Sequence, residues 1–176
     1  MSPRPNRPPL RGVHDLKFAV SDLDESLRFY ERALAARHMP ELDHTRDDGT
    51  RFAAVVEVPG LGTVLQLRLD PERAARQAMF DPLAIAVDDR VALERWDAAL
   101  TEREVLHSPI LDAVRGWLIV IQDPDGNRIR LYTLESHGPE INPATDNPWL
   151  TGEGVPIVGA GPTGMLTGSR QLVHGG

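Results

Sequence analysis

The sequence contains no cysteine, and this absence removes several kinds of chemistry at once. Disulfides, thiolate metal ligands, cysteine nucleophiles and thiol redox switches all need a sulfhydryl group. The sequence also lacks any run close to the ~20 apolar residues that a membrane-spanning helix needs. Residues 1–9 contain no apolar run of the kind found in a secretory signal. We therefore expect no membrane partner and a cytoplasmic location.

The sequence also has no excess of positively charged residues. The 176 residues include 19 Lys and Arg against 26 Asp and Glu, for a formal net charge of −7. Proteins that bind nucleic acid usually carry a basic surface, so nucleic acid is not an expected partner. A local basic pocket for a small anion is still compatible with this charge. The length suits one domain, or two small modules that share a core.

Proline and glycine are scarce in the middle of the chain and concentrated at its ends. Nine of the fifteen prolines lie within residues 1–9 or after His137, and nine of the fifteen glycines lie after His137. Proline interrupts both helices and sheet ladders. The composition predicts a Pro-rich arm (1–11), a folded domain (12–135) and a Gly/Pro-rich tail (136–176).

The first half of the domain alternates strand and helix signals. An apolar strand over 13–20 runs into Ser21-Asp22, a good helix N-cap, and Glu25 follows Asp22 as in a capping box. The helix that follows has one apolar face, formed by Leu23, Leu27, Tyr30 and Leu34. Two strands, 51–58 and 62–69, come next across a tight turn, and 71–77 is a linker that could hold a short helix.

The second half repeats this order. It contains a strand over 83–87, a helix capped by Asp88 or Asp89, and an Asp-Gly hairpin turn at 125–126. Aligning Ala19–Asp22 with Ala86–Asp89 gives an offset of 67 residues. Such an internal repeat predicts two modules, 12–70 and 80–135. The remaining strands are expected at 110–113, 117–122 and 128–134.

Two tandem βαβββ modules resemble the vicinal oxygen chelate superfamily, which includes glyoxalase I, extradiol dioxygenases, and fosfomycin- and bleomycin-resistance proteins. The resemblance is carried by Phe18–Tyr30 and by the hairpin Asp123–Leu131, and it covers residues 12–135. It implies an α+β fold in which a curved mixed sheet surrounds a cavity and the helices cover its convex face. It also implies pairing as a homodimer.

Metal-dependent members of that superfamily bind a divalent ion with side chains from the first and last strands of each module. The corresponding positions here are Asp15, Gln66, Pro82 and Arg130. Proline has no ligating side chain, and a guanidinium carries a permanent positive charge. We therefore predict no metal ion. A displaced metal site that uses His14, Asp15 and Gln66 is the alternative.

Alternation of strand side chains predicts what this cavity contains instead. Lys17 should share the face of Asp15, and Arg68 that of Gln66. Arg128 and Tyr132 should share the face of Arg130, with Arg128 exposed to solvent beside the hairpin. Trp117, Ile119 and Ile121 could join them from the neighbouring strand. The predicted ligand-binding residues are Lys17, Gln66, Arg68, Trp117 and Arg130.

These cations and aromatic rings suit an anionic or oxygen-rich small molecule. The alternative is an internal ion-pair network of Asp15 with Lys17 and Arg130, or a face open to water. The leading functional prediction is metal-independent binding, such as sequestration of a drug or natural product. The other is an enzyme of the same fold (a lyase, isomerase, cyclase or dioxygenase-like enzyme), with Asp15 and Tyr132 as catalytic groups. Cations near Asp15 would lower its pKa and favour an ion pair over proton transfer.

Three further segments leave alternatives open. His38 and His44 flank the polar stretch 41–50 and either close over a ligand or are solvated. The apolar pieces 148–150 and 155–158 could dock on the domain or on a partner subunit. Residues 155–165 contain the G-x-G-x-x-G pattern and resemble the opening of flavin-dependent hydroxylases. That family has an acidic residue about 20 positions later on a second strand. The twelve residues after Gly164 include no acid, so we expect no flavin and no other cofactor.

Overall fold

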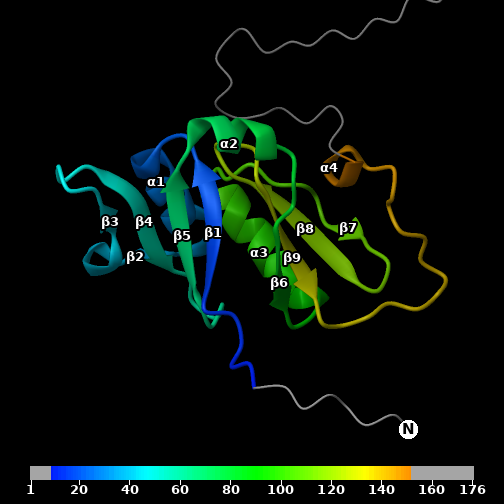
Figure 1. The fold of residues 1–176 in the computed structure, drawn as a ribbon. Coiled ribbons are helices and arrows are strands. Elements are labelled where there is room, and N and C mark those ends of the chain that lie inside the picture. The colour runs from blue at the N-terminus through cyan, green and yellow to red at the C-terminus, as the bar shows by residue number, and fades with distance from the viewer. Residues whose placement is uncertain (1–8, 152–176) are drawn as a thin grey trace, which may run out of the picture.

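The computed structural model describes residues 9–151 and contains two consecutive modules (Figure 1), of which the second has the expected order βαβββ and the first has one additional short strand. The expected α+β fold class is confirmed. The segments 1–8 and 152–176, including the G-x-G-x-x-G pattern, lie outside the described residues. None of the helices within residues 9–151 combines the length and the hydrophobicity that a bilayer-spanning helix requires.

The first module forms a five-stranded sheet, called sheet A here, in the order β1-β5-β4-β2, with the short β3 also paired to β4. Strands β1 and β5 run parallel, and the other pairs run antiparallel. Its elements are β1 (Asp15–Val20), α1 (Leu23–Leu34), β2 (Arg37–His38), a 3-10 turn (Pro40–Leu42), β3 (His44–Thr45), β4 (Arg51–Glu57) and β5 (Val64–Leu69).

The second module forms a separate four-stranded sheet, sheet B, in the order β6-β9-β8-β7. The curved surface is therefore built from two mixed sheets and not from one continuous sheet. Helix α2 (Pro71–Gln77) connects the modules, and a short helix α4 (Pro148–Thr151) follows the second module. The module itself contains β6 (Leu83–Val87), α3 (Arg90–Glu102), β7 (Leu111–Asp112), β8 (Trp117–Gln122) and β9 (Arg128–Thr133).

The internal repeat is visible at the two helix N-termini. The Asp22 carboxylate accepts a hydrogen bond from the backbone N–H of Glu25 at 2.8 Å. The Asp89 carboxylate accepts one from that of Ala92 at 2.7 Å. Each aspartate satisfies a helix N–H that has no partner within the helix. The cap therefore sets where each chain segment leaves its strand and enters its helix.

A single hydrophobic core joins the two modules. Helix α1 contributes Phe29 and Tyr30, α3 contributes Leu93 and Leu100, and both sheets contribute the inward side chains of their strands. Helices α1 and α3 lie on one side of the sheets (Figure 1). The opposite faces of both sheets are left for other contacts.

The hairpin between β8 and β9 also ties the modules together through Asp123, which is 0% exposed. Its carboxylate accepts hydrogen bonds from the Tyr30 hydroxyl at 3.0 Å and from the Asn127 backbone and side-chain N–H groups at 2.8 and 2.9 Å. The Asp125 N–H donates to it at 3.0 Å. The Asp125 carboxylate in turn accepts from the Ser21 N–H at 3.0 Å. The two sequence motifs that carry the family resemblance therefore contact one another directly.

The turn between β7 and β8 depends on Gly116, which gives a first prediction. A Cβ at this position would lie 2.4 Å from the Thr133 hydroxyl oxygen and 2.5 Å from the Glu135 carbonyl oxygen. The Gly116→Ala variant should therefore lose about 2 kcal/mol of unfolding free energy, measured by chemical denaturation. Gly138→Ala is the control, because its Cβ meets only the flexible Glu140 carboxylate. Equal stability of the two variants would contradict the crowding argument.

Candidate functional site

Four of the predicted site residues share the face of sheet A that points away from the helices. Lys17 on β1 lies opposite Gln66 on the neighbouring β5, and Ala19 lies opposite Arg68. Asp15 is two residues before Lys17 and therefore has the same orientation. We call this surface, defined by Asp15, Lys17, Gln66 and Arg68, the open face of sheet A.

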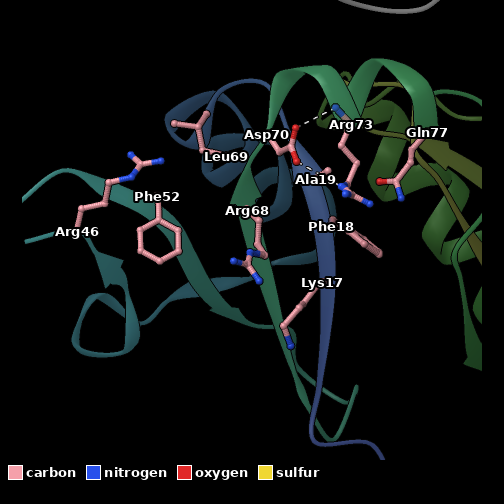
Figure 2. A pocket seen from close by; sticks show the side chains of 10 residues that line it. All are labelled: Lys17, Phe18, Ala19, Arg46, Phe52, Arg68, Leu69, Asp70, Arg73 and Gln77. Atoms are coloured by element: carbon pink, nitrogen blue, oxygen red, sulfur yellow. Dashed lines mark hydrogen bonds and ion pairs between the residues drawn. The ribbon is translucent and has the colours of Figure 1, made fainter.

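A cavity of about 530 Å³ lies at one end of this open face. It extends from β1 and β5 to the start of α2, and its lining is rich in cations (Figure 2). The only acid in the lining is Asp70, whose carboxylate lies 3.3 Å from the Nε atom of Arg73. The other cations that line the cavity are Lys17, Arg46 and Arg68.

Phe52 forms the aromatic centre of this cavity. The guanidinium carbons of Arg46 and Arg68 lie 5.5 and 5.9 Å from the centroid of its ring, within the range of cation–π contacts. Figure 2 shows the ring between these two side chains. Within residues 9–151, neither Arg46 nor Arg68 forms an ion pair with a carboxylate. Their hydrogen-bonding edges are available to a bound molecule.

A second cavity of about 330 Å³ continues along the open face and shares Lys17 and Arg68 with the first. Its floor is Gln66, which is only 5% exposed. The Gln66 Nε2 atom lies 3.0 Å from the Nε2 atom of His44. The Gln66 Oε1 atom is buried and has no hydrogen-bond partner among the described residues. An acceptor of this kind is costly to leave unpaired and fits a donor group on a ligand.

Asp15 is held in a local ion-pair cluster and does not meet Arg130. Its carboxylate pairs with the Lys17 ammonium and lies 3.0 Å from the Nδ1 atom of His14. Hydrogen bonds from Lys17 first, and then from His14, lower the pKa of Asp15. A carboxylate with a lowered pKa is a weak proton acceptor, so this environment disfavours Asp15 as a general base. Of the alternative ion-pair network, the pair between Asp15 and Lys17 is present, whereas Arg130 pairs with Asp81 instead of Asp15.

The residues at the family's metal-ligand positions do not fit a divalent cation. Asp15 is neutralised by Lys17, Gln66 is engaged with His44, and Arg130 places a guanidinium where a ligand would be needed. In the part of the chain that the structure describes, no group of three or more His, Cys, Asp or Glu residues could hold a metal ion. The alternative donor set of His14, Asp15 and Gln66 lines the smaller cavity of the open face, so a displaced metal site formed by these residues stays a prediction.

The corresponding face of sheet B is covered. Arg130 and Tyr132 on β9 lie opposite Val120 and Leu118 on β8, so these four side chains share a face. The segment around Trp149 packs on this surface. The Tyr132 hydroxyl accepts a hydrogen bond from the Arg115 N–H at 3.2 Å. Neither cavity of the open face includes Tyr132, so these cavities do not bring it together with Asp15 as a catalytic pair.

Two expectations about this second face are wrong. Trp117, Ile119 and Ile121 point to the helix side, because alternation along β8 separates them from Leu118 and Val120. Trp117 packs there against His137, with ring centroids 5.4 Å apart, and under Arg90 at 5.1 Å. Arg128, expected to be solvated, is only 2% exposed because the C-terminal segment covers it.

Arg46, Phe52 and Arg73 also line the larger cavity, although no sequence signal predicted them as site residues. Strand β3 has only two residues and a register irregularity against β4, so no periodicity marks the stretch 41–50 as part of the sheet. His38 and His44 were each expected either to close over a ligand or to be solvated, and the structure places them differently. His44 reaches the small cavity, whereas the Nε2 atom of His38 lies 2.9 Å from the carboxylate of Asp43.

Solved structures with the same fold come from several bacteria. A member of the glyoxalase/bleomycin resistance protein/dioxygenase superfamily from Sphaerobacter thermophilus is 26% identical, with a TM-score of 0.56 over 70% of this chain and 98% of that one. TnmS3, an antibiotic binding protein from Streptomyces sp. CB03234, is 25% identical, with a TM-score of 0.53 over 70% and 98% of the two chains. The fosfomycin resistance protein FosX from Listeria monocytogenes is 13% identical, with a TM-score of 0.56 over 70% and 93%.

A search of curated proteins gives no match. A family model does match, and it spans residues 12–131, which include every strand of both modules except the last two residues of β9. This range contains both motifs that carry the family resemblance, namely Phe18–Tyr30 and the hairpin Asp123–Leu131. The chain therefore belongs to the Glyoxalase/Bleomycin resistance protein/Dioxygenase superfamily.

Proposed function

We propose that this protein binds a small, ring-containing organic anion on the open face of sheet A, without a metal ion. The observation that carries the proposal is the group formed by Arg46, Phe52 and Arg68 in the 530 Å³ cavity. The two guanidinium groups flank an aromatic ring, and neither forms an ion pair with a carboxylate within residues 9–151. Free arginine edges of this kind bind carboxylate, phosphate or sulfonate groups in a bidentate way.

The size and shape of the site suit such a molecule. Ligand cavities commonly measure about 300–1,000 Å³ and combine apolar contact with a few polar groups. The Phe52 ring offers a stacking surface for a planar ring. The unpaired Gln66 Oε1 atom in the adjoining cavity would accept a hydrogen bond from a hydroxyl or N–H group of the ligand. The ligand class that follows is an aromatic acid that also carries a hydrogen-bond donor.

Binding is better supported than catalysis. Asp15, the predicted base, is paired with Lys17 and has a lowered pKa. Tyr132 lies on the other sheet beneath the C-terminal segment. Similarity to TnmS3, described as an antibiotic binding protein, also favours a protein that holds its ligand without converting it.

The experiment compares naphthoate with its neutral amide, naphthamide, by titration calorimetry. The wild-type protein should bind the anion more tightly than the amide, because only the anion pairs with the guanidinium groups. Arg68→Met should weaken naphthoate binding about tenfold, the effect of losing one charge-assisted hydrogen bond, and should leave naphthamide binding almost unchanged.

Arg95→Met is the matched control, because it removes the same charge from an exposed position on α3. It should leave the affinity for both compounds unchanged. Phe52→Leu should weaken both compounds equally, because it removes the stacking surface and keeps the charges. Equal affinity of the wild-type protein for acid and amide would contradict the proposed function.

A further inference from the structure

The surroundings of Arg128 are unusual for a buried cation. This side chain is 2% exposed on the covered face of sheet B, and no carboxylate among residues 9–151 forms an ion pair with it. Burial lowers its pKa, although an arginine stays protonated in proteins. Burying a charge without a counter-ion is unfavourable. The nearby Asp81 carboxylate offsets part of this charge, but it forms its ion pair with Arg130 and not with Arg128.

Arg128 donates mainly to carbonyl groups of the segment 147–150, and its Nη2 atom also lies 3.8 Å from the Met79 Sδ atom. Its Nη1 atom donates to the Trp149 carbonyl at 2.6 Å and to the Pro148 carbonyl at 3.4 Å. Its Nε atom is buried and has no hydrogen-bond partner in the described part of the chain. Its guanidinium also lies over the Trp149 ring, 5.9 Å from the centroid. Neutral carbonyl oxygens thus take the place of an anion.

A second guanidinium increases the local positive charge. Arg130 lies two residues further along the same strand, and its own Nε atom is also buried without a partner. Asp81 pairs with Arg130 and is the only acid that forms an ion pair with either arginine within residues 9–151. Two cations against one carboxylate leave a net positive charge under the segment. This arrangement favours a ligand that carries a negative charge.

The covering segment is attached by few contacts. Trp149 and Leu150 pack on the apolar side chains of β7 and β8, but no residue of α4 is fully buried. Before the helix, the Ala144 N–H donates to the Asp112 carbonyl at 2.8 Å. In sheet A the face away from the helices is open and forms the cavities described above. The two modules therefore differ mainly in whether the chain itself occupies this face.

We propose that residues 147–150 are an internal competitor that closes an oxyanion-binding site centred on Arg128 and Arg130. The ligand class is a carboxylate or phosphate group, whose oxygen would replace the Pro148 and Trp149 carbonyls on Arg128. The site is distinct from that on sheet A and does not depend on it. Binding of the oxyanion releases the segment, and the closed segment lowers the apparent affinity for the oxyanion.

The first test uses hydrogen–deuterium exchange of the full chain in an Arg68→Met background, which weakens binding on sheet A. The N–H groups of Leu150 and Thr151 both donate to the Asn147 carbonyl, at 2.8 and 3.0 Å, and report on the closed segment. Inorganic phosphate should accelerate their exchange several-fold, as should acetate at higher concentration. Sodium chloride of equal ionic strength should not. Exchange rates of these two N–H groups that stay unchanged with both phosphate and acetate would overturn the proposal.

The second test measures the phosphate affinity by titration calorimetry. Trp149→Ala should strengthen phosphate binding about tenfold by opening the segment, whereas Trp149→Phe keeps a ring and should stay near the starting value. Arg128→Met should abolish the gain. If Trp149→Ala does not fold, Leu150→Ala provides the same comparison. A variant whose segment exchanges freely but whose phosphate affinity is unchanged would show that the segment is a structural clasp and not a competitor.

Discussion

Replacing Asp123 by alanine should cost about 4 kcal/mol of unfolding free energy. The carboxylate is fully buried and accepts four hydrogen bonds, from Tyr30, Asp125 and both nitrogens of Asn127. Alanine would leave these donors unpaired in a site that excludes water. Urea denaturation followed by far-UV circular dichroism measures the loss.

Tyr30→Phe supplies a graded comparison, because it removes one of the four donors and keeps the ring in the core. It should cost about 1 kcal/mol. Asp123→Asn should fall between the two, because the amide keeps one acceptor oxygen but turns an N–H group toward other donors. A cost for Asp123→Ala no larger than that for Tyr30→Phe would show that the hairpin is held by apolar packing and not by its carboxylate.

The same carboxylate should make the stability depend on pH in an unusual direction. Burial, as the largest cause, raises the pKa of Asp123 from 3.8 to about 6 in the folded protein. The folded state then binds the proton more tightly than the unfolded state. The stability that protonated Asp123 contributes is fully present below about pH 4. It falls by about 3 kcal/mol as the pH rises through 6.

The stability contributed by three other carboxylates depends on pH in the opposite sense. The pKa values of Asp15, Asp48 and Asp70 are lowered by their hydrogen bonds, so their contributions are lost as the pH falls. The informative measurement is therefore the difference in unfolding free energy between the wild-type protein and Asp123→Asn, taken from pH 4 to pH 7. This difference should decline as the pH rises. A flat difference would mean that the four donors keep the pKa of Asp123 near its ordinary value.

Local signals in the sequence were sufficient for most of the fold. The N-cap role of Asp22 and the strands 83–87 and 117–122 follow from residue type and short-range periodicity. For 71–77 the same signals left a linker or a short helix open, and the structure has the helix. The 67-residue offset also anticipates the second module, because each copy repeats the strand, cap and helix. What the sequence did not indicate is that the curved surface consists of two separate sheets.

The site was less predictable because long-range contacts decide it. Alternation along β5 predicts that Gln66 and Arg68 share a face, but nothing local predicts that Arg46 and Phe52 come to lie beside Arg68. Alternation of side chains gave a wrong prediction for β8, because the sequence does not fix the register of β8 against β9. Leu118 lies opposite Tyr132, so Trp117 points to the helix side. The burial of Arg128 follows from Trp149, which is 21 residues away in the sequence.

The common hydrophobic core has a consequence for how this protein can be divided. Side chains of α1, α3 and both sheets meet in one cluster, and the hairpin carrying Asp123 reaches across to Tyr30. Neither half would keep a dry interior by itself, since each would expose the apolar side that the other now covers. A chain cut in the connection near α2 should therefore yield two fragments that are unstable separately and that reassemble when mixed.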